Sequence, residues 1–293
     1  MIDSLLWGAV AALSLGTSDF LARFTSLRLG AVLSFAYTVI TGAVLLTLYV
    51  VVAGGGIPFT PFGAALAVLH GLSVTAMTIM LYAALARGPI ALAVPLVAAH
   101  PVLVIIYELG LGVSRLSPQQ ITAALIIVLG VAGASALGVL GEGSRTEASG
   151  RKPGGANRTL LLAGGASFAY ALLIISGQAA AVEIGQISAT LIGRLTSVCV
   201  ILLAAAAGLF RFRLPGKSTL PLLFQGGLDT LGYLALLAGG ITAYPAITAV
   251  IGSSFGFLTI LLAWLIIKER LGGLQWFAIV ISFAGIAWLA SGH

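Results

Sequence analysis

Charged side chains are scarce in this 293-residue sequence, in which they make up 8% of the residues against 60% for hydrophobic ones. The mean hydropathy is +1.15. A soluble domain typically carries about a quarter charged residues. A chain this poor in charge cannot cover a globular surface with polar groups, which excludes an ordinary soluble protein of one or two domains. The surrounding solvent is therefore expected to be lipid.

Other absences narrow the function. The single cysteine, Cys199, excludes an internal disulfide. The sequence has no H-E-x-x-H motif, phosphate-binding loop or carboxylate cluster, so we expect no metal, no other cofactor and no ATP-driven pump. The net charge of +6 does not indicate nucleic acid, because the basic residues lie in short gaps between apolar runs. The N-terminal MIDSLLWG lacks the features of a signal peptide and predicts a retained helix.

Long apolar runs, by contrast, are abundant. A membrane-spanning helix needs about 20 mostly apolar residues, and helices are expected because lipid offers no partner for bare backbone polar groups. The runs do not alternate in polarity, as the strands of a membrane barrel would. We predict ten membrane helices, at residues 4–22, 30–52, 63–86, 89–107, 119–139, 158–181, 186–209, 219–239, 244–267 and 272–291.

A polar segment at 141–157 is rich in Gly, Ser and charged residues, which indicates a flexible linker. It separates the first five predicted helices from the last five. A shift of 155 residues aligns 113–133 with 268–288, which predicts an internal repeat. Because five is an odd number of membrane crossings, the second copy of the unit starts on the opposite side of the membrane and is inverted. Inverted repeats are typical of secondary transporters. The predicted fold is therefore an all-α integral membrane protein with ten transmembrane helices in two inverted five-helix repeats, 1–140 and 158–293.

Basic residues predict the orientation. Arg115 alone lies on the side of the N-terminus, whereas twelve others lie on the opposite side. These are Arg23, Arg28, Arg87, Arg145, Arg151, Lys152, Arg158, Arg211, Arg213, Lys217, Lys268 and Arg270. The positive-inside rule places the basic side in the cytoplasm. We therefore predict a multi-pass protein of the cytoplasmic membrane with both termini outside.

Three stretches carry a family resemblance: LYAALARGPIALAVPL (81–96), HPVLVIIYELGLGVSRLSPQQITAALIIVLGV (100–131) and LTILLAWLIIKERLGGLQWFAIVISFAGI (258–286). They resemble the EamA-type repeats of the drug/metabolite transporter superfamily. The matching residues are Glu269, Arg270, Leu271, Gln275 and Gly285, whereas Ser114 stands where the first repeat usually has Glu. The resemblance implies a ten-helix carrier, not an enzyme, which exports amino acids, metabolites or drugs. It also implies cytoplasmic termini, the reverse of the charge count.

Arg194 and Asp229 lie deep inside predicted helices, where a charge costs about 3 kcal/mol or more. Arg194 is expected at a depth of about 12 Å and Asp229 at about 15 Å, from the helical rise per residue. Because their helices are sequential and antiparallel, the two groups are expected to meet. They could form a structural ion pair. Alternatively they form a polar centre, in which Asp229 binds a proton or an amine and Arg194 binds a carboxylate.

Other polar residues are weaker candidates for substrate binding. Gln225, Asp229 and Tyr233 share one face of a helix through their i, i+4, i+8 spacing. His100 and His70 are lone histidines in apolar runs, where packing is the commoner role. The secondary candidates are Tyr82, Tyr170 and Gln178. Asp19 is interpreted as a surface pair with Arg23, four residues further on.

We expect a secondary transporter that moves a small metabolite, an amino acid or derivative, by alternating access and in the export direction. Its partners would be that substrate, the lipid bilayer and, as a candidate coupling ion, the proton. One alternative is a multidrug exporter for lipophilic cations, and another is a scaffold that transports nothing. The stretch GSSFG at 252–256 formally matches G-x-S-x-G and leaves an intramembrane serine hydrolase open. The simpler interpretation of Gly252 and Gly256 is a close contact between helices.

Overall fold

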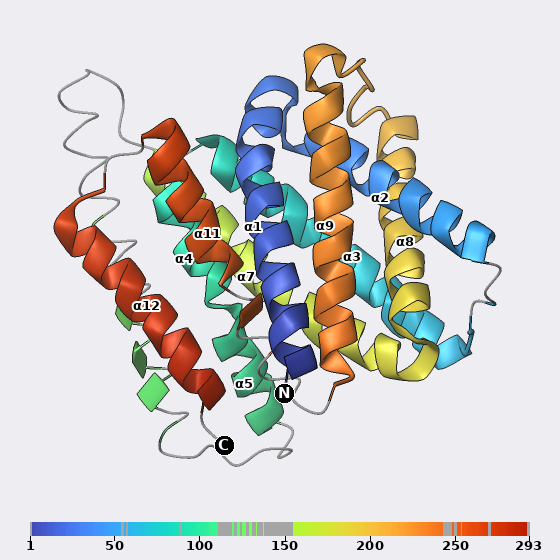
Figure 1. Ribbon diagram of the computed structural model, residues 1–293. Helices are drawn as coiled ribbons and strands as arrows, with labels where there is room; N and C mark the ends of the chain where they lie inside the picture. The colour runs from blue at the N-terminus through green and yellow to red at the C-terminus, as the bar shows by residue number, and fades with distance from the viewer. Residues whose placement is uncertain are drawn as a thin grey trace.

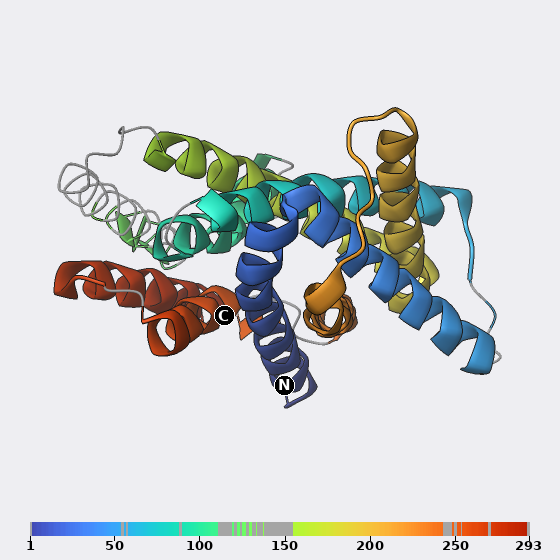
Figure 2. The same ribbon diagram turned by 90° about the horizontal axis from the view of Figure 1, so that it is seen from above.

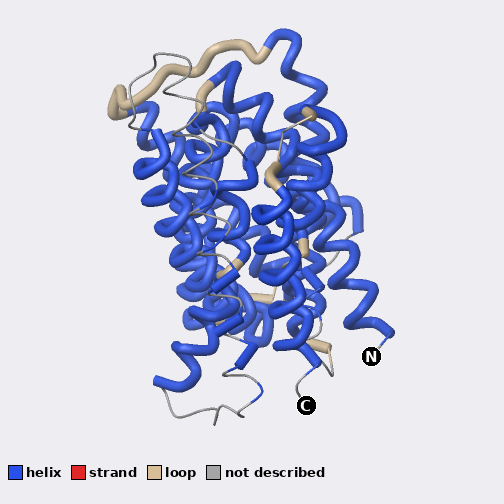
Figure 3. Tube along the Cα trace, turned by 90° about the vertical axis from the view of Figure 1, so that its left-hand side faces the viewer, coloured by secondary structure: helices blue, strands red, loops and turns tan. Residues whose placement is uncertain are grey.

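The structure is a computed structural model that describes residues 2–53, 56, 58–87, 90–110, 155–242, 248, 251–252, 254–268 and 271–291, with single positions between 119 and 137. Over these residues the chain forms helices and loops and no strand (Figure 3). The predicted helix at 119–139 and the linker at 141–157 lie mostly outside the described residues. The described part therefore confirms an all-helical fold.

Six of the described helices are long and apolar enough to cross a membrane. They are α1 (Ile2–Leu29), α2 (Ala31–Ala53), α3 (Pro61–Arg87), α7 (Gly155–Ile184), α8 (Gln186–Ala206) and α9 (Thr219–Gly240). Each corresponds to one predicted span, and α1 extends seven residues beyond the predicted end at residue 22. Many of their large apolar side chains are exposed, such as Leu48, Val52 and Leu203, as expected where lipid surrounds the protein.

Two predicted spans are interrupted. The run at 89–107 forms α4 (Ile90–Ala98) and α5 (His100–Gly110), which meet at a turn at Ala99. Pro101 has no backbone N–H to continue the helical ladder across this turn. The run at 244–267 is broken by a turn at Ser254, after which α11 (Phe255–Leu262) and a π-helical turn (Ala263–Ile267) follow.

The last helix, α12 (Gly273–Ser291), follows the predicted charged boundary. Lys268 adopts a left-handed conformation at φ 57°, which ends the preceding helical segment where the sequence changes from apolar to charged. A short 3-10 turn (Gly216–Ser218) precedes α9.

The long helices form a bundle in which the N-terminal part of the chain packs on the C-terminal part (Figure 1). Figure 2 shows α1 and α9 on one side of the bundle and α3 and α7 on the other, flanked by α11 and α12 at one edge and by α2 and α8 at the opposite edge. α1 packs on α9 and α11, and α3 packs on α7 and α8. The start of α1 and the end of α12 lie at the same end of the bundle (Figure 1).

Close approaches between these helices depend on glycine. A Cβ on Gly226 of α9 would lie 2.7 Å from both the Thr38 carbonyl oxygen and the Thr41 Cβ of α2. A Cβ on the adjacent Gly227 would instead lie 3.8 Å from its nearest neighbour, Leu45. In lipid, where no hydrophobic effect drives helices together, such small residues permit tight van der Waals packing.

This difference predicts a contrast between two neighbouring substitutions. Gly226→Ala should lower the stability of the purified protein by about 1–3 kcal/mol, the usual cost of overpacking, because α2 would have to move away. Gly227→Ala adds the same methyl group one position along and should leave stability unchanged or slightly higher. Thermal unfolding of both variants in detergent measures the contrast, and equal melting temperatures would contradict it.

Candidate functional site

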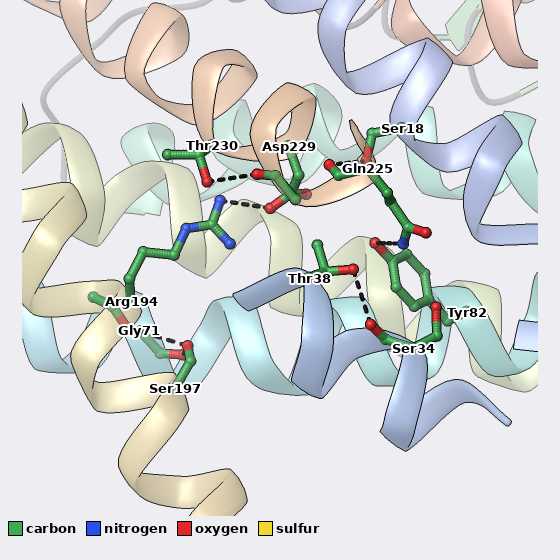
Figure 4. Close-up of polar contacts among 12 residues, drawn as sticks. Ser18, Ser34, Thr38, Gly71, Tyr82, Arg194, Ser197, Gln225, Asp229 and Thr230 are labelled. Atoms are coloured by element: carbon green, nitrogen blue, oxygen red, sulfur yellow. Dashed lines mark hydrogen bonds and ion pairs between the residues drawn. The ribbon is translucent and has the colours of Figure 1, made fainter. Parts of the chain in front are cut away.

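The charged pair predicted from the sequence is formed in the middle of the bundle. Arg194 is the ninth residue of α8 and Asp229 the eleventh of α9. Arg194 Nη2 lies 2.5 Å from Asp229 Oδ2, and the two side chains are only 3% and 7% exposed (Figure 4). The expectation that the two groups meet is confirmed. Each charge is thereby neutralised where water is absent.

The guanidinium has a second partner and one unused group. Its Cζ lies 5.1 Å from the centroid of the Tyr233 ring, close enough for a cation–π interaction. Arg194 Nη1 is buried and has no hydrogen-bond partner among the described residues. Because buried donors are normally paired, this N–H group is available to donate a hydrogen bond to a ligand.

A small cavity lies beside the pair, with both Asp229 and Tyr233 in its wall. Its volume of about 10 Å³ leaves room for about one water molecule. Its other polar lining residues are Asp19 of α1, Thr78 of α3 and Tyr170 of α7. The cavity is therefore built by helices from both parts of the chain. It is closed to anything larger than water in this conformation.

Gln225, one turn before Asp229, does not line this cavity. Its Nε2 donates to the Tyr82 hydroxyl at 2.8 Å, and its Oε1 accepts from Thr25 Oγ1 at 2.8 Å. Thr25 Oγ1 lies 2.6 Å from Ser34 Oγ, and Ser18 Oγ donates to the Gln225 carbonyl at 3.2 Å (Figure 4). Both ends of the fully buried amide are thus used in joining α9 to α1 and α3.

The two predicted histidines lie against neighbouring helices. His70 Nδ1 is 3.0 Å from the Leu173 carbonyl, and its ring fits between Gly177 and Gly193. A Cβ on either glycine would lie within 2.7 Å of that ring. His70 also meets the Tyr233 ring edge-on, with centroids 6.3 Å apart. These contacts support the packing interpretation.

His100 reaches the cavity only through a neighbour. Its ring stacks on Tyr170 with centroids 3.9 Å apart, and Nδ1 lies 3.1 Å from the Val97 carbonyl. Tyr170 itself lines the cavity, so α5 fixes one aromatic wall of it. Gln178, two turns further along α7, lies against Gly240 and not in the cavity lining.

The role predicted for Asp19 is wrong. The predicted surface pair with Arg23 is not formed, because Asp19 is only 6% exposed and lines the cavity. Arg23 instead donates to the Leu85 carbonyl. The predicted span ended at residue 22, which placed Asp19 near the membrane surface. α1 continues to Leu29, so Asp19 lies ten residues from its end.

The GSSFG stretch holds helices together. A Cβ on Gly252 would lie 2.7 Å from Leu236, and one on Gly256 would lie 2.9 Å from Val94. Ser254 occupies a turn between helical residues, and no strand precedes it among the described residues, so the elbow of a hydrolase is not formed there. The helix-contact interpretation of the two glycines therefore agrees with the structure.

Six apolar helices of membrane-crossing length in the described part of the chain, packed around a buried ion pair, are the architecture of a multi-pass membrane protein. Residues 157–291 match the EamA-like transporter family, so the chain carries a domain of that family, which is a family of transporters and not of enzymes. No curated protein matches the chain. Twenty-five chains of solved structures do. One, described only as "Crystal structure of protein", is 18% identical, with a TM-score of 0.68 over 97% of this chain and 95% of its own. At this identity the likeness concerns the fold alone.

The hydrogen bonds of Gln225 predict a stability effect that a second glutamine should not share. Gln225→Ala would remove the hydrogen bonds that the buried amide makes with the Tyr82 and Thr25 hydroxyls, which should cost about 1–3 kcal/mol. Gln178→Ala removes a half-buried amide of the same size and serves as the matched control. Thermal unfolding in detergent compares the two, and a double-mutant cycle with Tyr82→Phe should show coupling only for Gln225.

Proposed function

We propose that the protein is a secondary carrier that exports a small amino acid or derivative across the cytoplasmic membrane by alternating access. The observation that carries the proposal is the Arg194–Asp229 pair at the edge of a closed central cavity. A zwitterion bears the same two charges as this pair. Its ammonium group can replace the guanidinium beside Asp229, and its carboxylate can bind Arg194, including the unused Nη1.

We further propose that the carrier consists of two inverted five-helix repeats, 1–140 and 158–293, joined by the linker at 141–157. The helix contacts support this. If each helix is exchanged for its counterpart in the other repeat, the α3–α7 contact becomes α9–α1, and the α3–α8 contact becomes α9–α2. The contact between α1 and α11 likewise becomes that between α7 and α5. Each of these counterpart contacts occurs in the structure.

Individual residues follow the same shift of 155 positions. Gly71 of α3 approaches the Gly193 carbonyl and Thr196 of α8 closely. Its counterpart, Gly226 of α9, approaches Thr38 and Thr41 of α2, which are the counterparts of Gly193 and Thr196. A match at three positions in both contacts supports the repeat more strongly than apolar sequence identity, which arises easily by chance.

The polar contacts of α1 are consistent with a carrier closed at both ends. Near its end, Thr25 bonds to Gln225 and Arg23 bonds to the Leu85 carbonyl. Near its start, Ser4 Oγ lies 2.9 Å from Thr242 Oγ1, and Thr248 Oγ1 donates to the Ser4 carbonyl at 3.0 Å. Alternating access would break one set of contacts while keeping the other, since the cavity must enlarge to admit a substrate.

Flux through proteoliposomes tests the proposed role of the pair. Arg194→Gln and Asp229→Asn should each reduce exchange of labelled amino acids by roughly ten- to hundredfold, because a hydrogen bond to a charged group contributes about 1.5–3 kcal/mol. Either single variant also leaves the remaining charge buried without a partner, so a loss of flux could reflect misfolding.

The double variant Arg194→Met/Asp229→Leu separates the two explanations. It removes both charges, and replacement of a buried ion pair by apolar residues is often neutral for stability. We expect wild-type thermal stability in detergent without amino-acid exchange. Exchange at the wild-type rate would show that the pair is only structural and would overturn its proposed role.

A multidrug exporter is the second candidate, favoured by an apolar groove of about 510 Å³ on the side of the bundle. Leu45, Tyr49 and Leu231 line this groove, which extends inward as far as Thr230. A lipophilic cation such as tetraphenylphosphonium needs a carboxylate and no guanidinium. Transport of this cation that survives Arg194→Gln but not Asp229→Asn would therefore favour the second candidate.

The proposed orientation, with the basic loops in the cytoplasm, can be tested with single cysteines in a Cys199→Ser background. Lys217→Cys, before α9, should react with a membrane-impermeant maleimide only after cells are opened. Phe59→Cys, in the loop between α2 and α3, should react in intact cells. The reverse pattern would place both termini in the cytoplasm and contradict the charge count.

A further inference from the structure

The charges around the central cavity do not balance. Two carboxylates, Asp19 and Asp229, face it from α1 and α9. One guanidinium, that of Arg194, neutralises Asp229. Within the described part of the chain, the structure contains no second ion pair, and none involves Asp19. The site is therefore one positive charge short.

The groups that face Asp19 from the surrounding helices cannot supply that charge. α7 contributes Tyr170, and α9 contributes Tyr233 and the already paired Asp229. α3 contributes Thr78 with two apolar side chains, and α11 contributes Phe255. The nearest basic residue along α1, Arg23, donates to the Leu85 carbonyl. Among the described residues that line the space with Asp19, the hydroxyls and rings are neutral, and Asp229 adds a second negative charge.

An ionised carboxylate in this position would be both dehydrated and repelled by Asp229. Asp19 is 94% buried in a cavity that holds about one water, so solvent cannot compensate. A buried acid without a cation takes up a proton instead. Intramembrane acids in such settings mark proton and ion pathways in transporters.

We propose that Asp19 is the proton-binding site of the cavity: it holds a proton in this closed conformation and exchanges it with the solution when the bundle opens. We assign the proton to Asp19 and not to Asp229, because Asp229 already has Arg194 as a partner for its charge. Only one step rests on the proposed function, namely that in a carrier this proton would be the coupling ion. Proton binding itself can be measured without any substrate.

Infrared spectroscopy of the purified full-length protein in an ester-free detergent tests this directly. A protonated carboxylic acid has a C=O stretching band that a carboxylate lacks. At neutral pH the wild type should show this band, and it should shift after transfer to D₂O because the proton exchanges. Asp19→Asn should remove the band, and Asp19→Glu should retain it at a shifted frequency. Asp3→Asn, which changes an exposed acid on the same helix, should leave it unchanged.

Two results would overturn the assignment. One is the absence of the band from the wild type, which would mean that Asp19 is ionised and holds another cation, such as sodium. The other is a band that persists in Asp19→Asn, which would place the proton elsewhere. Because Asp19→Asn could fold poorly, the deuterium shift in the wild type and the frequency change in Asp19→Glu decide the question independently. A protein that shows the Asp19 band but transports no amino acid would refute the proposed function and keep the proton site.

Discussion

The structure depends on one constraint: lipid cannot solvate a charge, so a charge inside the bundle needs a partner inside the bundle. Arg194 meets this need through Asp229 and the Tyr233 ring. The pair fixes α8 against α9 at mid-depth. Gly42 lets α2 come close enough to cover it, because a Cβ at that position would collide with Thr230 and lie 3.4 Å from Arg194 Nε. The position of three helices thus follows from one buried interaction.

The same constraint explains what could be predicted from the sequence. Six spans were predictable because length and hydropathy alone decide whether a helix can cross a membrane. The meeting of Arg194 and Asp229 was predictable because opposite charges at similar depth on adjacent helices have few other partners. Asp19 was not predictable in this way. The predicted span ended at residue 22, whereas Ser18 and also Thr25, beyond that end, form hydrogen bonds inside the bundle to Gln225.

Polarity within an apolar run shows that a side chain needs a partner, but not which partner it has. His70 and Gln225 were singled out for the same reason, and they occupy equivalent positions under the 155-residue shift. Each of the two residues also contacts the same position of the neighbouring repeat. His70 contacts the carbonyl of Leu173, and Gln225 accepts, through its own carbonyl, a hydrogen bond from Ser18, which is the counterpart of Leu173. The side chains themselves differ in their contacts. The His70 ring fits between two glycines, whereas the Gln225 amide forms hydrogen bonds with two hydroxyl groups. The breaks at Ala99 and Ser254 show a similar limit, since Pro101 marks the first and no proline marks the second.

In the proposed repeat, the helices of the two halves correspond to each other, but the charged residues do not. The counterparts of Asp19, Arg194 and Asp229 are Ile174, Val39 and Val74, all buried and apolar. In the proposed carrier, a related pair of halves would allow the contacts at either end of α1 to open in turn. A single set of charges gives a bound molecule only one orientation, whichever end is open. The binding groups are then the same for both sides of the membrane, so they cannot impose a direction of transport. Direction must come from a gradient, either of the substrate or of a proton that the cavity exchanges, which is why the unpaired carboxyl on α1 matters as much as the paired one on α9.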